Sequence, residues 1–490
     1  MYVSRDYCGG FGSAFPVKKG FNYSTFPPIF DAYAASMLER EGHSVGIIDA
    51  QAEKISAKEL LAKVEKENPQ VIFSRISLPS SKGDFEAVDL LKSSFPDTSY
   101  AGWGSICKVE PKVVLLRSKL DLVVRDELEF VVADLVKAIK GDKDLNHVKG
   151  ISFKTPTGIV HNSSLPFEKD LDVLPFPAYH LLDMKKYVAS ESYFFPGGSK
   201  NKTVNFFTIL GSRGCNINCM YCAYPVIFGP WRALSPRRVV DEIEFVVRNY
   251  GIRVLWFHDQ LFTMVSERTE RICDEIINRQ IHVTWACETH VKNLPDELVQ
   301  KMKQAGCTRI QVGIETGDPE LLANVGKRGC TVEEVEKVLF MLREEGILVE
   351  SNFIVGLPGE NWNAVRNTGR MIRKTKPDDV SISMITPYPG TSLFNMAKEK
   401  GWIVSEDWTL YTTGNPVMTL PNFSGKDMRD AARYLYGTFL WTKGLTEITR
   451  QAKEDGFRKL VKTIVSNLPA VGSGAYLIMR SQIRHKINMH

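Results

Sequence analysis

Short apolar runs alternate with stretches of helical spacing along most of this sequence of 490 residues, and this alternation restricts the fold more than any other feature. Strands separated by helices of such length form βαβ units around a parallel sheet. In the N-terminal third we expect strands at 45–49, 71–74, 98–101 and 120–124, and helices at 31–41, 57–66, 85–92 and 127–139. No GxGxxG motif follows the first of these strands, which argues against a dinucleotide site.

A second series of strands and helices begins at Val204 and ends near Pro389. Its strands are expected at 206–210, 254–257, 283–287, 309–312, 350–355 and 380–385, and its helices at 236–250, 266–279, 296–305, 332–345 and 363–374. Six strands with five intervening helices predict a partial parallel barrel rather than a full eightfold one. We therefore expect an α/β protein with a parallel-sheet domain at 1–145, a linker with a hairpin and a Pro-rich stretch at 146–200, the barrel at 201–395 and a mainly helical region at 396–490.

The composition excludes several classes of protein. Hydrophobic residues make up 43% and charged residues 24%, as in ordinary globular proteins. The net charge of +5 is too small over this length to indicate nucleic-acid binding. Residues 1–16 lack the apolar core of a secretory signal, and no apolar run reaches the length of about 18 residues that a spanning helix needs.

The cysteines carry the clearest chemical signal. The sequence has nine, an odd number that argues against a disulfide framework and favours a reducing cytoplasm. Cys215, Cys219 and Cys222 form a CxxxCxxC pattern on a glycine-containing loop after the strand expected at 206–210. Three thiolates on one short loop suit an iron–sulfur cluster, which would keep one iron open. The alternative is a zinc ion held by the same cysteines and a distant histidine.

This loop resembles that of the radical S-adenosylmethionine (SAM) superfamily, in which an aromatic residue, here Tyr221, precedes the third cysteine. The resemblance implies a [4Fe–4S] cluster on Cys215, Cys219 and Cys222, with the open iron bound by SAM. It also implies an oxygen-sensitive, anaerobic enzyme. One electron from a reductase, flavodoxin or ferredoxin would cleave SAM to methionine and a 5′-deoxyadenosyl radical, and the protein would position SAM and exclude water.

Later segments also resemble parts of this superfamily. Residues 256–259 end the second barrel strand, 311–316 resemble its GIES segment, 353–359 its late glycine-rich strand end and 386–391 its PYPGT element. The resemblance implies SAM contacts from Tyr221, Asp259, Gln311, Glu315, Gly356 and Tyr388. An acid at a strand end is otherwise an ordinary solvated charge, and the register with the cysteine loop favours a function most firmly for Glu315.

Residues 27–391 resemble, more specifically, radical SAM proteins with a cobalamin-binding domain before the barrel. This implies a flavodoxin-like (Rossmann-type) fold for the first domain, in which ligands bind at the carboxyl ends of strands. Cobalamin contacts are accordingly expected from Asp49, Ser74, Ser77, Gly102, Trp103, Gly104 and Ser105. No DxHxxG motif supplies a lower-ligand histidine, and we interpret the lone His258 and His282 as structural. The alternative is a domain that has lost cobalamin and serves as a scaffold.

This subgroup includes cobalamin-dependent methylases of unactivated carbon or phosphorus and the anaerobic magnesium-protoporphyrin monomethyl ester cyclase. In the methylases, one SAM generates the radical that abstracts a substrate hydrogen, and a second SAM supplies the methyl group through cobalamin. We therefore expect methylation of a small molecule. Oxidative cyclisation is the alternative reaction, and a non-catalytic cobalamin or cluster carrier is the alternative from another class. Aromatic residues at 434–441 would suit a tetrapyrrole or a lipid, yet equally a helical core.

Overall fold

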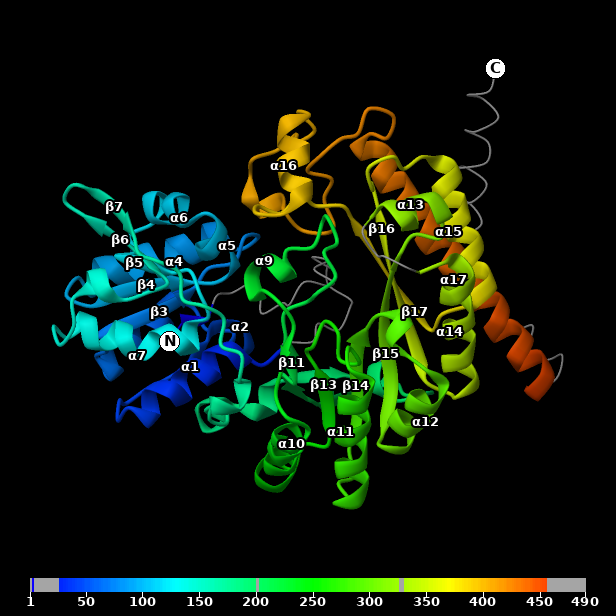
Figure 1. Cartoon of the computed structure of the whole chain (residues 1–490), viewed down its shortest axis with the longest axis horizontal. Helices are drawn as coiled ribbons and strands as arrows, with labels where there is room; N and C mark the ends of the chain where they lie inside the picture. Colours follow the sequence, from blue (N-terminus) through cyan, green and yellow to red (C-terminus); the bar gives the residue numbers. More distant parts are fainter. Residues whose placement is uncertain (1, 4–25, 200–201, 326–329, 456–490) are drawn as a thin grey trace.

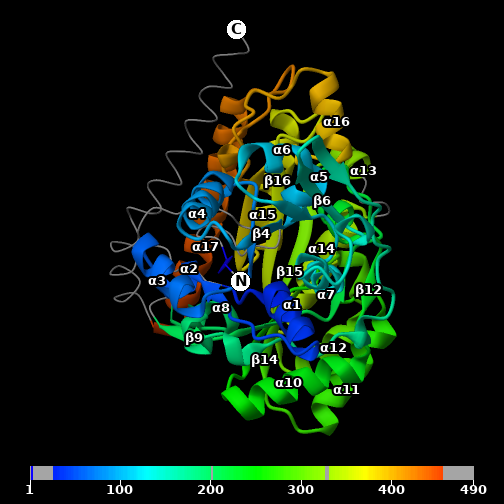
Figure 2. The ribbon, with the colours of Figure 1, turned by 90° about the vertical axis from the view of Figure 1, so that its left-hand side faces the viewer.

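The computed structural model describes residues 2–3, 26–199, 202–325 and 330–455, with side chains for those between residues 26 and 444. Two α/β domains lie side by side, the N-terminal sheet with its helices and the barrel with its own (Figure 1). In the view from the N-terminal side, the helices of the first domain stand in front of the barrel strands (Figure 2). No helix in the described ranges combines the length and the apolar character needed to cross a bilayer.

The N-terminal sheet has the strand order β2-β1-β3-β4-β5-β6-β7. Its parallel strands are β1 (Tyr2–Val3), β2 (Ile48–Asp49), β3 (Val71–Arg75), β4 (Ser99–Trp103) and β5 (Leu122–Val124). The order 2-1-3-4-5 is that of flavodoxin-like folds, so the predicted fold of this domain is confirmed. The sequence pattern did not reveal β1, because only two residues of it pair with its neighbours.

Helices cover both faces of this sheet. One face carries α1 (Ile29–Arg40) and α7 (Leu128–Ile139), which pack on each other, and their apolar side chains belong to a core that continues into the barrel. The apolar side chains of the helices on the other face form a separate core. These helices are α3 (Ala57–Glu67), α4 (Ser81–Ser94), α5 (Ser105–Val109) and α6 (Pro111–Arg117).

The predicted hairpin exists but extends the first sheet instead of standing in a linker. Its strands are β6 (Ile151–Thr155) and β7 (Gly158–His161), and β6 pairs antiparallel with β5. The pairing joins segments about 30 residues apart in the chain, and local sequence patterns do not show such long-range contacts. The structural first domain thus reaches to His161.

The second sheet contains only parallel strands, in the order β10-β13-β14-β15-β16-β17. They are β10 (Phe207–Ile209), β13 (Val254–Phe257), β14 (Thr284–Thr289), β15 (Cys307–Glu315), β16 (Leu348–Val355) and β17 (Asp379–Met384). The five predicted helices are α10 (Pro236–Tyr250), α11 (Ser266–Asn278), α12 (Asp296–Gln304), α14 (Val332–Glu344) and α15 (Trp362–Thr375). The predicted α/β class with a six-stranded partial barrel is confirmed.

Shorter elements complete the described chain. They are α2 (Ala50–Glu53), β8 (Val188–Ser190), α8 (Glu191–Phe194), β9 (Thr203–Asn205), β11 (Ser212–Arg213), α9 (Tyr224–Phe228), β12 (Arg232–Ala233), α13 (Pro319–Asn324) and α16 (Ser392–Glu399). The long α17 (Gly425–Asp455) packs on α15 and β17. The helical prediction for the end of the chain also covers residues 456–490, which lie outside the described ranges.

Buried polar contacts fix the two domains and the linker to one another. Glu242 of α10 is fully buried and accepts hydrogen bonds from Tyr33 of α1 and from Tyr179 of the Pro-rich linker. Its charge is balanced by Arg238, one turn earlier on the helix, at 2.8 Å. Since a buried carboxylate is costly unless it is paired, this cluster stabilises one relative placement of the domains.

Candidate active site

The three loop cysteines lie between β11 and α9, beyond the carboxyl end of the first barrel strand. Pairing of β11 with β12 closes the base of this loop. Gly214 has a φ of 76°, and a Cβ there would lie 2.0 Å from the Pro230 carbonyl oxygen, so the turn before Cys215 requires glycine. Cys215, Cys219 and Cys222 are half-buried and free of disulfide bonds.

Asp259 stabilises the start of this loop through hydrogen bonds. Its buried carboxylate accepts hydrogen bonds from the Gly211 backbone nitrogen at 2.8 Å and from the Ser212 hydroxyl at 2.6 Å. Burial raises the pKa of Asp259 to about 6, and the neighbouring Arg268 guanidinium acts in the opposite direction. The structure therefore places this predicted SAM contact in a supporting position outside the cavity that the cysteines line.

That cavity has a volume of about 1160 Å³, part of it open to solvent, and lies at the carboxyl ends of the barrel strands. All three cysteines line it, together with the predicted SAM contacts Tyr221, Glu315 and Tyr388. Its other polar lining residues, which the sequence reasoning did not propose as SAM contacts, are Tyr224, Gln260, Glu288, Thr289, His290, Asn352, Ser381, Ser383, Thr386 and Thr413. Some of them occupy alternate positions, such as Glu288 and His290 or Ser381 and Ser383. Alternate residues of a strand lie on the same face, so this spacing indicates in the sequence that such residues can share one cavity.

Glu315 stands out by its backbone. It has a φ of 71°, in the left-handed region, at an irregularity in the pairing of β15 with β16. A non-glycine residue in that region is strained and recurs at functional sites. Its side chain is buried, and its charge adds to burial in raising the pKa of Tyr221 well above the usual value. The strain and the position both favour a ligand-binding role for Glu315.

Two further predicted SAM contacts do not reach the cavity wall. The Gln311 amide donates a hydrogen bond to the Tyr193 hydroxyl at 2.8 Å, deeper in the barrel. Gly356 has a φ of 92°, and a Cβ there would lie 2.8 Å from the Met428 sulfur and 2.7 Å from Ile385. The missing side chain of Gly356 thus admits helix α17 in this structure.

The residues around the three cysteines bear on which metal they could hold. Among the described residues, no three His, Cys, Asp or Glu side chains converge closely enough to hold one metal ion. All three thiols nevertheless face the same cavity.

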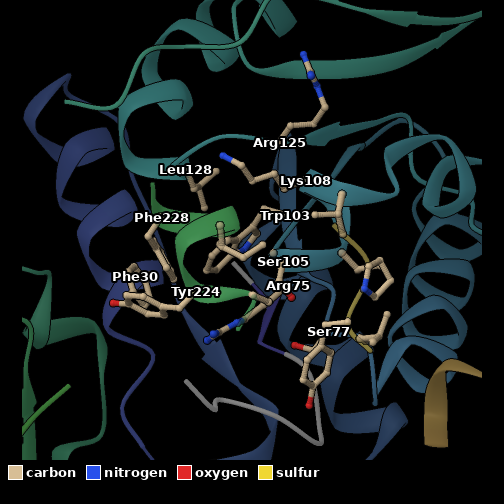
Figure 3. A pocket seen from close by; sticks show the side chains of 18 of the residues that line it. Phe30, Arg75, Ser77, Trp103, Ser105, Lys108, Arg125, Leu128, Tyr224 and Phe228 are labelled. Atoms are coloured by element: carbon tan, nitrogen blue, oxygen red, sulfur yellow. The ribbon is translucent and has the colours of Figure 1, made fainter. Parts of the chain in front are cut away.

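A second cavity lies between the two domains. The empty space within it is about 1350 Å³, a figure that includes open solvent. Figure 3 shows Trp103 and Ser105 of the first domain on one side of this space and Tyr224 and Phe228 of α9 on another. The predicted cobalamin contacts Ser77, Trp103, Gly104 and Ser105 line it.

The remaining predicted cobalamin contacts lie within the first domain, away from this cavity. Asp49 caps α2 by accepting from two backbone nitrogens and also accepts from the Tyr187 hydroxyl at 3.0 Å. Ser74 is fully buried within β3. A Cβ on Gly102 would lie 2.5 Å from the Leu120 side chain, so this glycine serves core packing. None of the three lines the interdomain cavity.

The end of β4 shapes the wall of the interdomain cavity. Gly104 has a φ of 125°, and a Cβ there would lie 2.4 Å from the Ile76 carbonyl oxygen, so the backbone turn itself requires glycine. Trp103 is 8% exposed, and its indole nitrogen has no hydrogen-bond partner in the described part of the chain. The Arg75 guanidinium lies 5.1 Å from the Trp103 ring centroid. A buried N–H without a partner on a cavity wall fits a bound group that accepts a hydrogen bond.

The two cavities share part of their walls. Ala223, Tyr224, Tyr388 and Thr413 line both. Tyr224 follows the third cysteine by two positions and is 2% exposed, and no described residue pairs with its hydroxyl. Ligands in the two cavities would therefore be separated by little more than one layer of side chains.

A buried ionic cluster connects the cysteine loop to the first domain. Arg213, two positions before Cys215, donates to Glu127 at 3.0 Å and also to Glu129. Arg232 of β12 donates to the second oxygen of Glu127 at 2.9 Å. Burial acts to raise the pKa of Glu127, but the two arginines hold it below the usual value. The loop and the wall of the interdomain cavity are thus mechanically linked.

Comparisons with known proteins agree with this geometry. Residues 209–372 match the family model of the Radical SAM superfamily. The chain is 28% identical over 418 residues to an uncharacterized methyltransferase, PH0819, of Pyrococcus horikoshii, with 85% of this chain and 88% of that protein covered. It is 26% identical over 430 residues to the anaerobic magnesium-protoporphyrin IX monomethyl ester cyclase of Rubrivivax gelatinosus, with 86% and 75% covered.

Among solved structures, the cobalamin-dependent SAM radical enzyme OxsB, with aqua-cobalamin and SAM bound, superposes with a TM-score of 0.71 at 17% identity. The match covers 93% of this chain and 70% of OxsB and supports the fold of both domains together. The matched residues 209–372 contain the cysteine loop, the four barrel strands β13 to β16 and Glu315. Residues 209–372 therefore constitute a radical SAM domain, as the cysteine pattern predicts.

Proposed function

We propose that the protein is a radical SAM enzyme that uses cobalamin to methylate an unactivated carbon or phosphorus of a small molecule. The observation that carries this proposal is the wall of Tyr224, Tyr388 and Thr413 shared by the two cavities. Methyl transfer through a corrin requires SAM, corrin and substrate within reach of one another, and catalysis depends on such proximity. A carrier protein would have no use for the cavity around Glu315.

The barrel cavity is the proposed site of the cluster and of SAM. Cys215, Cys219 and Cys222 would hold a [4Fe–4S] cluster, which when bound supplies the electron for reductive cleavage of SAM. The Glu315 carboxylate faces this cavity and would accept hydrogen bonds from the SAM ammonium or hydroxyl groups. The Asn352 side-chain oxygen is buried in the same wall without a hydrogen-bond partner among the described residues, which supports a ligand there. The electron donor would be a reductase, flavodoxin or ferredoxin.

The interdomain cavity is the proposed site of cobalamin. Its place between the two domains and the unpartnered indole N–H of Trp103 support this assignment. The relatives point the same way, since one is named a methyltransferase and OxsB was solved with aqua-cobalamin bound. When bound, cobalamin supplies a methyl carrier, while this chain orients the corrin and separates it from bulk water.

Isotope transfer tests the proposal. The anaerobically reconstituted protein is supplied with hydroxocobalamin, a reductant and SAM carrying a deuterated methyl group, together with panels of small molecules that include tetrapyrroles and isoprenoid lipids. We expect 5′-deoxyadenosine and a labelled product, both lost when the three loop cysteines are replaced by alanine. Cleavage of SAM that never transfers label to any acceptor, the corrinoid included, would overturn the methylation proposal.

Oxidative ring closure is a second candidate, favoured by the 26% identity to the anaerobic cyclase over most of both chains. The same experiment separates the two reactions. Cyclisation of a magnesium-protoporphyrin monomethyl ester would yield 5′-deoxyadenosine and a product without the deuterated methyl group. Methylation would give a mass increase by one labelled methyl group.

A further inference from the structure

His258 is a cavity-lining group to which the proposed function gives no role. It follows β13, and its backbone nitrogen donates to the Ile209 carbonyl oxygen at 2.9 Å, which fixes its position at the end of the strand. Its side chain lines the interdomain cavity together with Arg75 and Trp103. Within the described ranges its ring contacts Phe26, with 6.2 Å between the centroids, and neither ring nitrogen takes part in a hydrogen bond.

The surroundings keep this imidazole uncharged. Burial, together with the nearby Arg75 guanidinium, lowers the pKa of His258 to about 4, so the ring is neutral at neutral pH. Arg75 is held in place by Asp31 at 3.8 Å and by the face of Trp103. A neutral imidazole has a free lone pair on one nitrogen and can bind a transition metal, whereas the protonated ring cannot.

We propose that His258 supplies an axial nitrogen ligand to the cobalt of a corrin bound in the interdomain cavity. Among the described residues that line this cavity, His258 is the one with an imidazole, and imidazole suits first-row transition metals. The sequence favours a structural histidine, but a structural histidine pairs its ring nitrogens, and this one does not. The ligand comes from the barrel, so no DxHxxG motif in the first domain is needed. The inference rests on the proposed function, because it requires a corrinoid in this cavity.

Electron paramagnetic resonance of bound cobinamide tests the assignment. Cobinamide lacks the dimethylbenzimidazole base of cobalamin, so an axial nitrogen can come only from the protein. The full-length protein is loaded with cobinamide, reduced to the Co(II) state and freed of excess corrinoid by gel filtration. We expect each resolved high-field cobalt line to split into a triplet from one nitrogen nucleus, and to become a singlet in His258→Ala.

Two controls keep the test sharp. His282→Ala, which changes a histidine that lines a different cavity, should retain the triplet. Wild-type protein grown with ¹⁵N-labelled histidine should show doublets instead of triplets, a result that does not depend on the folding of any variant. Singlets in the wild type with cobinamide bound, or triplets that persist in His258→Ala, would overturn the ligand assignment and leave the proposed function intact. A wild-type protein that retains neither cobinamide nor cobalamin would overturn both.

Discussion

Removal of the Arg213 charge should destabilise the junction between the cysteine loop and the first domain. In Arg213→Met, the Glu129 carboxylate stays buried at 2% exposure without its cation, whereas Glu127 keeps Arg232 at 2.9 Å. Loss of one partner of a buried ion pair costs about 3–5 kcal/mol, because the remaining charge is neither hydrated nor neutralised. Methionine preserves most of the side-chain volume, so the charge is the main change.

A double-mutant cycle isolates this effect. In Arg213→Met/Glu129→Gln, residue 129 carries no charge that lacks a partner. The loss of unfolding free energy in the double variant should therefore be smaller than the sum of the losses in the two single variants, by roughly 0.5–3 kcal/mol. Arg279→Met is the matched control. Arg279 also contacts several carboxylates, including Asp241 at 2.6 Å, but its side chain is 23% exposed, and such pairs contribute about 1 kcal/mol or less.

Urea unfolding followed by circular dichroism measures these differences, and iron content after reconstitution reports the state of the loop. We expect a large fall of the urea midpoint and lower iron content in Arg213→Met, and neither change in Arg279→Met. If Arg213→Met unfolds within 1 kcal/mol of the wild type, a threshold on the order of a surface pair, then the buried cluster does not hold the junction.

Three further predictions concern single positions and the loop cysteines. Replacing all three loop cysteines by alanine should abolish iron and sulfide binding. The control Cys107→Ala, in the core of the first domain, should retain both. An iron content equal to that of the wild type in the triple variant would exclude the cluster site. Glu315→Ala should weaken SAM binding at least about tenfold in equilibrium dialysis at unchanged iron content, since a charged hydrogen bond contributes about 1.5–3 kcal/mol. Burial raises the pKa of Glu360 from 4.5 to about 8, so the folded protein binds an extra proton between these values and its stability falls as pH rises toward 8. In Glu360→Gln, the change in unfolding free energy between pH 6 and pH 9, measured by urea titration, should be smaller than in the wild type. An equal change in both proteins would contradict this prediction.

The sequence predicts the barrel well because its information is local. The barrel strands contain short stretches rich in apolar residues between amphipathic helices, and start signals such as the N-cap Ser235 and Pro236, the first residue of α10, mark the helix boundaries. The cysteine pattern likewise occupies eight consecutive positions, so its spacing alone indicates the cluster. By contrast, β1 and the pairing of β6 with β5 depend on contacts between distant segments and could not be predicted this way.

The same distinction between local and long-range information applies to the site residues. Glu315 and Tyr388 line the predicted cavity because a strand end fixes where they lie. Asp259 and Gly356 belong to the right segments, yet their side-chain positions face a supporting loop and helix α17. A motif specifies the segment that reaches a site, whereas the direction of each side chain depends on strand alternation and on local irregularities such as the bulge at Glu315.

The shared wall between the cavities follows from topology and domain packing acting together. In both parallel sheets the loops that bind ligands lie at the carboxyl ends of the strands, which is where Trp103 and the cysteine loop are found. Topology alone does not make these ends face each other. The Glu242 cluster at the linker and the Arg213 cluster at the loop are buried charges that are satisfied in one arrangement only. If these clusters set the geometry, substitutions in the Glu242 cluster should weaken corrin binding, although its residues line neither cavity.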